Sequence, residues 1–157
     1  MLTDDQAAFI QGGRISITAA SRDARRLPSV VRAAACRLDA GGERMTLLLA
    51  TRQAAQVLAD VAATGAIAVV FSEPSTHRTL QFKGRDARLD SVRPDDLALA
   101  CAHRDSFVEE LLPLGYTREF ARTIHSVPGD ELSAVSFTVT EVYEQTPGPR
   151  AGARVTP

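Results

Sequence analysis

The chain has 157 residues, which is enough for one compact domain with a hydrophobic core. Hydrophobic residues make up 45% of it and charged residues 24%, as in ordinary globular proteins. Its 18 basic and 19 acidic side chains leave a formal net charge of −1, so we expect no long-range attraction to nucleic acid or to an anionic membrane. One domain is expected over residues 1–145, followed by an irregular tail over 146–157 that is rich in proline and glycine.

The N-terminus is acidic and lacks the basic start and apolar run of a signal peptide. No apolar stretch approaches the roughly 20 residues of a membrane-spanning helix. We therefore expect a cytoplasmic protein. Cys36 and Cys101 form no Cys-x-x-Cys pair, so we expect small buried hydrophobic side chains rather than a zinc site.

The first 50 residues predict one short helix and three strands. Thr3 and Gln6 have the spacing of a capping box at the start of a helix, which the glycine pair beginning at Gly12 ends. A turn at residues 39–42 joins the second and third strands as a hairpin. Alternating apolar and polar residues predict a strand at 14–20, a run rich in small residues predicts one at 29–38, and a third strand is expected at 44–50.

A second helix is predicted directly after the third strand. Thr51 has the side chain of a helix N-cap, and Ala54, Leu58 and Val61 share one face of the helix that follows. Gly65 is placed to end it as a C-terminal glycine.

A long strand is predicted over 78–90, after a central strand at 66–72 that is apolar on both faces. In the strand over 78–90 the apolar residues change phase, from even-numbered positions at Leu80 and Phe82 to odd-numbered positions further along. A pleated strand can do this only through a bulge, and Gly84 is the residue best suited to one.

The last third of the chain predicts two helices and a closing strand. Pro94 begins a helix that runs to about Leu114, with a distortion at Pro113. A shorter helix is expected over 117–124, and an alternating strand over 132–143 closes the sheet. Strands joined mostly by short turns favour an antiparallel barrel over alternating βαβ units, so the fold class is mainly β with helical excursions.

No motif for metal binding or nucleophilic catalysis is visible. His77, His103 and His125 are isolated from one another in sequence, and we interpret them as surface or helix-end histidines. There is no G-x-S-x-G nucleophile motif and no phosphate-binding glycine pattern.

A phosphate would therefore have to be held by side chains on strands, with arginine as the fork-shaped donor. Arg32 and Arg37 lie in a strand of small apolar residues, and their odd spacing places them on opposite faces of a regular strand. Gln81 and Lys83 share the face opposite Leu80, where they could donate to a heteroaromatic ring and stabilise negative charge near it. The alternative is an ordinary solvent-facing strand surface.

Three segments carry a resemblance to a known family. The run AIAVVFSEPSTHRTLQFKGRDARL resembles the strand–turn–strand of FMN-binding split barrels related to pyridoxamine 5′-phosphate oxidase. PSVVRAAACRLDAGGERMTLLL resembles the first hairpin of that family, and VSFTVTEVYEQTPGPRAG resembles the end of a small bacterial branch of it. The resemblance implies a six-stranded antiparallel split β-barrel that forms a homodimer, with two FMN sites at the subunit interface.

The resemblance also implies roles for individual residues. Arg32 and Arg37 match the basic ends of the strand that lines the flavin site, with Arg37 the better match for the phosphate. Thr51 could offer its hydroxyl to the phosphate. Gln81 matches the glutamine that approaches the flavin ring, and Lys83 follows on the same face.

The chain departs from the oxidase proper at the inserted helix. The oxidases carry an Arg-Lys pair there, where this chain has Gln56 and Val57. The resemblance thus implies an FMN-dependent oxidoreductase of unknown substrate rather than the pyridoxamine-phosphate enzyme. Two alternatives stay open: a non-catalytic module that binds flavin, haem or another flat ligand for storage or sensing, and a purely structural dimerisation domain.

Overall fold

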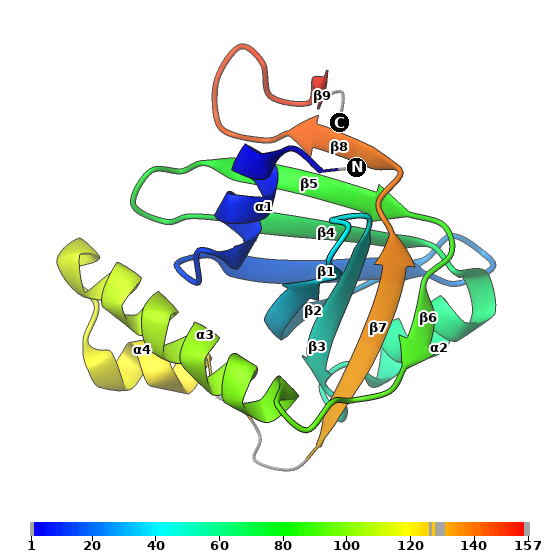
Figure 1. Ribbon diagram of the computed structural model, residues 1–157, viewed down its shortest axis with the longest axis horizontal. Coiled ribbons are helices and arrows are strands. Elements are labelled where there is room, and N and C mark those ends of the chain that lie inside the picture. Colours follow the sequence, from blue (N-terminus) through cyan, green and yellow to red (C-terminus); the bar gives the residue numbers. More distant parts are fainter. Residues whose placement is uncertain (1, 126, 128–130, 156–157) are drawn as a thin grey trace.

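The computed structural model describes residues 2–125, 127 and 131–155. Within these residues nine strands form one antiparallel sheet in the order β6-β7-β3-β2-β1-β4-β5-β8-β9 (Figure 1). The strands are β1 Ser16–Arg22, β2 Pro28–Leu38, β3 Arg44–Ala50, β4 Ile67–Ser72, β5 Thr79–Gly84, β6 Arg88–Asp90, β7 Leu132–Thr138, β8 Glu141–Glu144 and β9 Arg154–Val155. The helices are α1 Asp4–Gln11, α2 Ala55–Thr64, α3 Asp96–Leu111 and α4 Arg118–Ile124, with a 3₁₀ turn at Leu112–Leu114.

The sheet curls so that the inner faces of its two halves share one hydrophobic core. Ile17 of β1 and Phe82 of β5 belong to the same buried cluster as Leu47 of β3 and Phe137 of β7. Phe71 packs edge-on against Phe82, with ring centroids 5.4 Å apart and an interplanar angle of 83°. Edge-to-face contact is a favourable arrangement for two aromatic rings in addition to the burial of their surface. The mainly β, barrel-like fold class expected from the sequence is confirmed in this form.

The helix α1 extends this core. The Thr3 hydroxyl accepts from the backbone N–H of Gln6, and the Gln6 side chain accepts from the backbone N–H of Thr3, so the predicted capping box is present. Phe9 and Ile10 are buried in the main core cluster. The capped turn thus fixes the direction in which these two side chains enter the barrel.

The helix α2 also packs into the core, through Val57 and Val61. Gly65 ends it in the left-handed conformation, as predicted, with φ at 64°. Its N-cap is Ala54, which makes no side-chain capping bond. The prediction that Thr51 caps this helix is wrong, because the Thr51 hydroxyl donates instead to the backbone carbonyl of Glu131.

The helix α3 lies over the outer face of β2, β3 and β7, and α4 packs against α3 (Figure 1). Ala100 of α3 meets a second buried cluster formed by Ala34, Ala35, Leu48 and Ala134. Small side chains on both surfaces allow the helix to approach the sheet closely. The predicted distortion of the helix end is present as the 3₁₀ turn, and it leaves the side chain of Leu114 exposed.

The expected six strands are nine because two predicted strands each break in two and the tail adds β9. Both breaks occur at one corner, where the end of β5 meets the end of β7. A Cβ atom on Gly84 would lie 2.5 Å from Phe137 Cδ2 and 2.7 Å from the Thr138 carbonyl oxygen, so only glycine fits there. The chain then leaves β5, and β6 pairs with β7 instead of continuing beside β4. The single bulged strand predicted over 78–90 is therefore wrong.

The same corner bends the closing strand. The backbone N–H of Thr140 donates to the Lys83 carbonyl at 2.9 Å, after which β8 pairs with β5. One continuous segment thus belongs to both halves of the sheet, with β7 beside β3 and β8 beside β5. The segment β7–β8 therefore connects the two edges of the sheet.

No helix among the described residues is both long enough and apolar enough to cross a membrane. Cys36 lies in the main core, and burial raises the pKa of its thiol. Cys101 on α3 is half-buried, and neither cysteine forms a disulfide.

Candidate functional site

The outer face of β4, β5 and β8 lies opposite the core into which α1 and α2 pack. Gln81 and Lys83 lie on this face, while Leu80 and Phe82 of the same strand are buried in the core. The predicted two-faced character of β5 is confirmed. The amide of Gln81 makes no hydrogen bond to any of the residues that the structure describes, so it is free to contact a ligand.

Strand pairing places Gln81 in one row across this face. Gln81 pairs with Val70 of β4, Val70 with Thr18 of β1, and Thr18 with Arg32 of β2; on the other side Gln81 pairs with Tyr143 of β8. Three strand spacings separate Arg32 from Gln81, roughly 14 Å. The two short side chains between them leave a shallow floor along the row.

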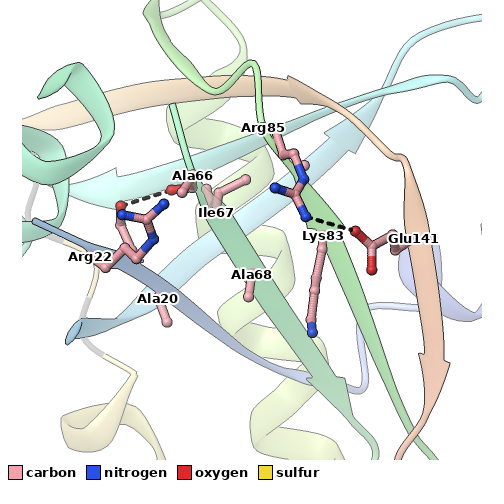
Figure 2. A pocket seen from close by; sticks show the side chains of 10 residues that line it. Ala20, Arg22, Ala66, Ile67, Ala68, Lys83, Arg85 and Glu141 are labelled. Carbon is pink, nitrogen blue, oxygen red and sulfur yellow. Dashed lines mark hydrogen bonds and ion pairs between the residues drawn. The ribbon is translucent and has the colours of Figure 1, made fainter. Parts of the chain in front are cut away.

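A cavity of about 330 Å³ lies next to this row (Figure 2). Ala20 and Ala68 form its small-residue floor, and Ala68 pairs directly with Lys83. Arg22 at the end of β1 and Arg85 just after β5 stand on either side of β4. Small residues at the centre with basic residues at the margin leave room for a ligand that carries negative charge.

The charges around this cavity are mostly unneutralised. Three cations line it, Arg22, Lys83 and Arg85, against the single carboxylate of Glu141. Glu141 lies 3.6 Å from Arg85 and accepts a hydrogen bond of 2.5 Å from the Tyr143 hydroxyl. That bond and the nearby cations lower the pKa of Glu141, and it raises the pKa of Tyr143. The remaining positive charge favours an anionic group.

Lys83 is held over the Tyr143 ring, with its Nζ atom 4.3 Å from the ring centroid. A cation above an aromatic face is weakly stabilised while most of its hydrogen-bonding capacity stays available. Lys83 is also the only lysine in the sequence.

Arg32 and Arg37 both face outward, contrary to the prediction that they lie on opposite faces. A register shift between Ala33 and Ala35 inserts one extra residue into β2, which restores the same orientation after an odd spacing. Val31 and Cys36 take the inward positions on either side of the bulge.

The two arginines nevertheless have different surroundings. Arg37 Nε donates to Asp96 Oδ1 at 2.9 Å under the start of α3, and Asp96 is only 1% exposed. Arg32 is exposed and donates to the Ser16 hydroxyl at 3.1 Å and to His125 Nε2 at 3.0 Å. A role for either residue toward a flavin stays a prediction.

The structure places Thr51 away from both groups. Its hydroxyl lies 2.9 Å from the Glu131 carbonyl and 2.9 Å from the Ser133 hydroxyl, where it joins the end of β3 to the start of β7. Its predicted contact with a phosphate is untested, and its observed partners give it a structural role.

Sequence reasoning missed a buried histidine pair formed by His103 of α3 and His125 at the end of α4. His103 and His125 lie with ring centroids 6.0 Å apart, and Phe107 packs against His125 at 4.3 Å. Interpreting His103 as a surface or helix-end residue was wrong, since it lies within α3 and is 7% exposed. The one available signal was the spacing of four between His103 and Phe107, which puts both on one helical face.

Both histidines are held neutral. Burial lowers the pKa of His103, and burial with the nearby Arg32 charge lowers that of His125 to about 3. Because a guanidinium can only donate, His125 Nε2 must accept from Arg32. In the described part of the chain, no group of three or more histidine, cysteine or acidic side chains is placed to hold a metal ion.

Solved structures share this architecture. HupZ from group A Streptococcus aligns with a TM-score of 0.57 at 16% identity, over 97% of this chain and 100% of that one. An F420 reductase aligns at 0.54 and 15% identity, over 89% and 98% of the two chains. A putative pyridoxamine 5′-phosphate oxidase from Lactobacillus delbrueckii aligns at 0.53 and 13% identity, over 90% and 93%.

No protein-family model and no curated protein matches the sequence. At identities this low the likeness concerns the fold, and it extends over nearly the whole of each chain. The expected resemblance is confirmed at that level: the chain has the split-barrel fold of the pyridoxamine 5′-phosphate oxidase-like proteins.

Proposed function

We propose that this protein binds FMN on the outer face of β1, β4, β5 and β8 and uses it as a flavin-dependent oxidoreductase. The observation that carries the proposal is the alignment of Gln81 and Lys83 on the outer face of β5, beside a cavity of about 330 Å³ with excess positive charge. The shared split-barrel fold supports the same reading.

The residues present fit a flavin in three respects. Thr18, Ala20 and Ala68 leave a floor low enough for a flat ring system to lie against the sheet. The free amide of Gln81 and the ammonium of Lys83 lie beside that floor. An amide donates to the electron-rich edge of a heteroaromatic ring, and an ammonium stabilises negative charge there.

The phosphate group would be held by the basic margin of the cavity, Arg22 and Arg85. Guanidinium groups bind phosphate through paired, charge-assisted hydrogen bonds. When bound, the flavin would supply the capacity for hydride and electron transfer, and the protein would supply orientation and charge. The substrate is not specified by these residues.

A homodimer is part of the proposal, with the two sites at the interface. Exposed apolar side chains flank the open face at the β1–β2 hairpin, where Leu27 is 55% and Val30 67% exposed. Such residues at the margin of a flat sheet surface are suited to contact with a second copy. Sedimentation of the protein with and without FMN tests whether the dimer forms and whether the flavin needs it.

The binding test is an absorption spectrum of the purified protein, followed by FMN titration with flavin fluorescence as the readout. Gln81→Ala and Lys83→Met should each weaken FMN binding by about tenfold, the loss of roughly one charge-assisted or ring-directed hydrogen bond. Gln11→Ala, at the exposed end of α1, is the matched control. An unchanged flavin signal across the titration would refute the proposal.

The single lysine offers a second readout. Acylation with an amine-specific reagent, followed by mass spectrometry, should modify Lys83 less in the presence of FMN. The catalytic reading is then separated from a storage or sensing module by adding a reduced nicotinamide and an electron acceptor. Binding without turnover would favour the non-catalytic module.

A further inference from the structure

The groove between α4 and the outer face of β1 and β2 is a second hollow, distinct from the cavity in Figure 2. Its volume is about 560 Å³, within the range of small-molecule sites. The sheet contributes Ser16 and Arg32, and the turn between β4 and β5 contributes Ser75 and His77. The opposite wall comes from the end of α3 and from α4.

That opposite wall is apolar and exposed. Tyr116 and Phe120 stack with ring centroids 5.4 Å apart and an interplanar angle of 12°, and each is 48% exposed. Leu114 and Ile124 add exposed aliphatic surface to the same groove. Exposed apolar side chains gathered in one hollow, rather than scattered over a surface, indicate a binding site.

The basic side of the groove carries an unmatched charge. Arg32 donates only to neutral partners, the Ser16 hydroxyl and His125 Nε2, and it forms no ion pair with any carboxylate of the described residues. The lowered pKa of His125 keeps that partner neutral. A guanidinium next to a hydroxyl presents adjacent donors that match the two oxygens of a carboxylate.

The rim of the groove is fixed in place. The Ser75 backbone N–H donates to Glu110 Oε1 at 2.8 Å, which ties the β4–β5 turn to α3. In that turn His77 adopts the left-handed region, with φ at 60°. The turn that carries His77 is thus held against α3 and gives the groove a fixed edge.

We propose that this groove binds a small planar aromatic carboxylate, whose ring packs against Tyr116 and Phe120 and whose carboxylate is held by Arg32. Arg32 lines this groove but Gln81 and Lys83 do not, and a carboxylate ligand here goes beyond the flavin binding proposed above. It assigns the helical excursion a recognition role, with α4 supplying the ring contacts and β2 the charge.

The test is titration with 2-naphthoate and with its neutral isostere 2-naphthamide, followed by calorimetry. We expect the carboxylate to bind at least about tenfold more tightly than the amide, since only the carboxylate pairs with Arg32. Arg32→Met should abolish this preference, whereas Arg32→Lys should retain part of it. Phe120→Ala should weaken both ligands equally, because it removes ring contact and not charge.

Arg52→Met, at an exposed arginine elsewhere on the surface, is the matched control and should change neither affinity. Equal binding of the two probes, or a preference that survives Arg32→Met, would overturn the proposal. Displacement of 2-naphthoate by FMN, with the same loss of FMN affinity in Arg32→Met, would assign the groove to the flavin site instead. A Phe120→Ala variant that turns a dimer into a monomer would assign it to an interface between copies.

Discussion

The outer faces of the two halves of the sheet differ in how their positive charges are neutralised. Over β2, β3 and β7, α3 covers the surface, and the one arginine beneath its start, Arg37, is neutralised by the buried carboxylate of Asp96. Around the cavity on β1, β4 and β5, the three cations Arg22, Lys83 and Arg85 stand against the single carboxylate of Glu141. The same barrel therefore uses positive charge for stability on one half and leaves it available on the other.

The difference separates two meanings of a basic residue in a strand. A guanidinium that meets a buried carboxylate completes a fold, because either charge alone would be costly to bury. A cation that contacts only an aromatic ring, a hydroxyl or solvent contributes little to folding stability and remains available to bind a ligand. Arg37 belongs to the first kind, and Lys83 and Arg32 to the second.

The largest effect is expected on the covered half. Arg37→Met would leave the Asp96 carboxylate buried without its cation, which typically costs about 3–5 kcal/mol of unfolding free energy. The double variant Arg37→Met, Asp96→Leu should recover much of this loss, since it removes both charges. Urea unfolding followed by circular dichroism measures both. A loss under about 1 kcal/mol in the single variant would mean that the ion pair is not what holds α3 on the sheet.

The corner that joins the two halves should come next. Gly84→Ala would place a Cβ atom 2.7 Å from the Thr138 carbonyl oxygen and 2.5 Å from Phe137, so β5 and β7 would have to separate. We expect a loss of about 2 kcal/mol, as for other overpacked core positions. Gly41→Ala is the control, because a Cβ there meets nothing within 4 Å. Equal stability of the two variants would show that the corner yields without cost.

Much of this contrast was accessible from the sequence, and some was not. Alternation in β5 correctly placed Gln81 and Lys83 opposite Leu80 and Phe82, because parity along one strand is a local property. Capping at Thr3 and termination at Gly65 were likewise local and correct. Each depends only on neighbours a few residues away.

The failures share the opposite cause. The break after Gly84 depends on contact with Phe137, 53 residues later in the chain, which no local pattern records. The bulge that turns Arg32 and Arg37 to one face lies in a run of alanines, where parity leaves no hydrophobic signal. The His103–His125 pair forms only when α3 and α4 pack together. Contacts between segments far apart in the sequence, rather than local secondary-structure propensity, determine each of these features.

The histidine pair predicts a pH dependence at the boundary between the halves. Since the pKa of His125 falls to about 3 in the folded protein, the unfolded chain, with an ordinary pKa near 6.5, binds the proton more tightly. Stability is therefore lost as the pH falls from about 6.5 toward 3, and is fully present above that window.

The variant His125→Gln removes this titration while its amide oxygen can still accept from Arg32. Between about pH 7 and pH 5, we expect the natural protein to lose on the order of 2 kcal/mol more than this variant, or roughly 4–8 °C in Tm. Gln11→Ala, at the exposed end of α1, removes no titratable group and should track the natural protein. Parallel curves for the natural protein and His125→Gln would contradict the assignment.

The smallest effect on stability is expected at Lys83, on the outer face of β5. Lys83→Met removes only the contact with the Tyr143 ring, so it should cost less than about 1 kcal/mol in urea unfolding. The same substitution should weaken FMN binding by about tenfold, because the ammonium is then missing from the ligand face. A large loss of stability with unchanged FMN affinity would reverse the roles assigned to the two halves, since Lys83 would then hold the fold together as Arg37 does.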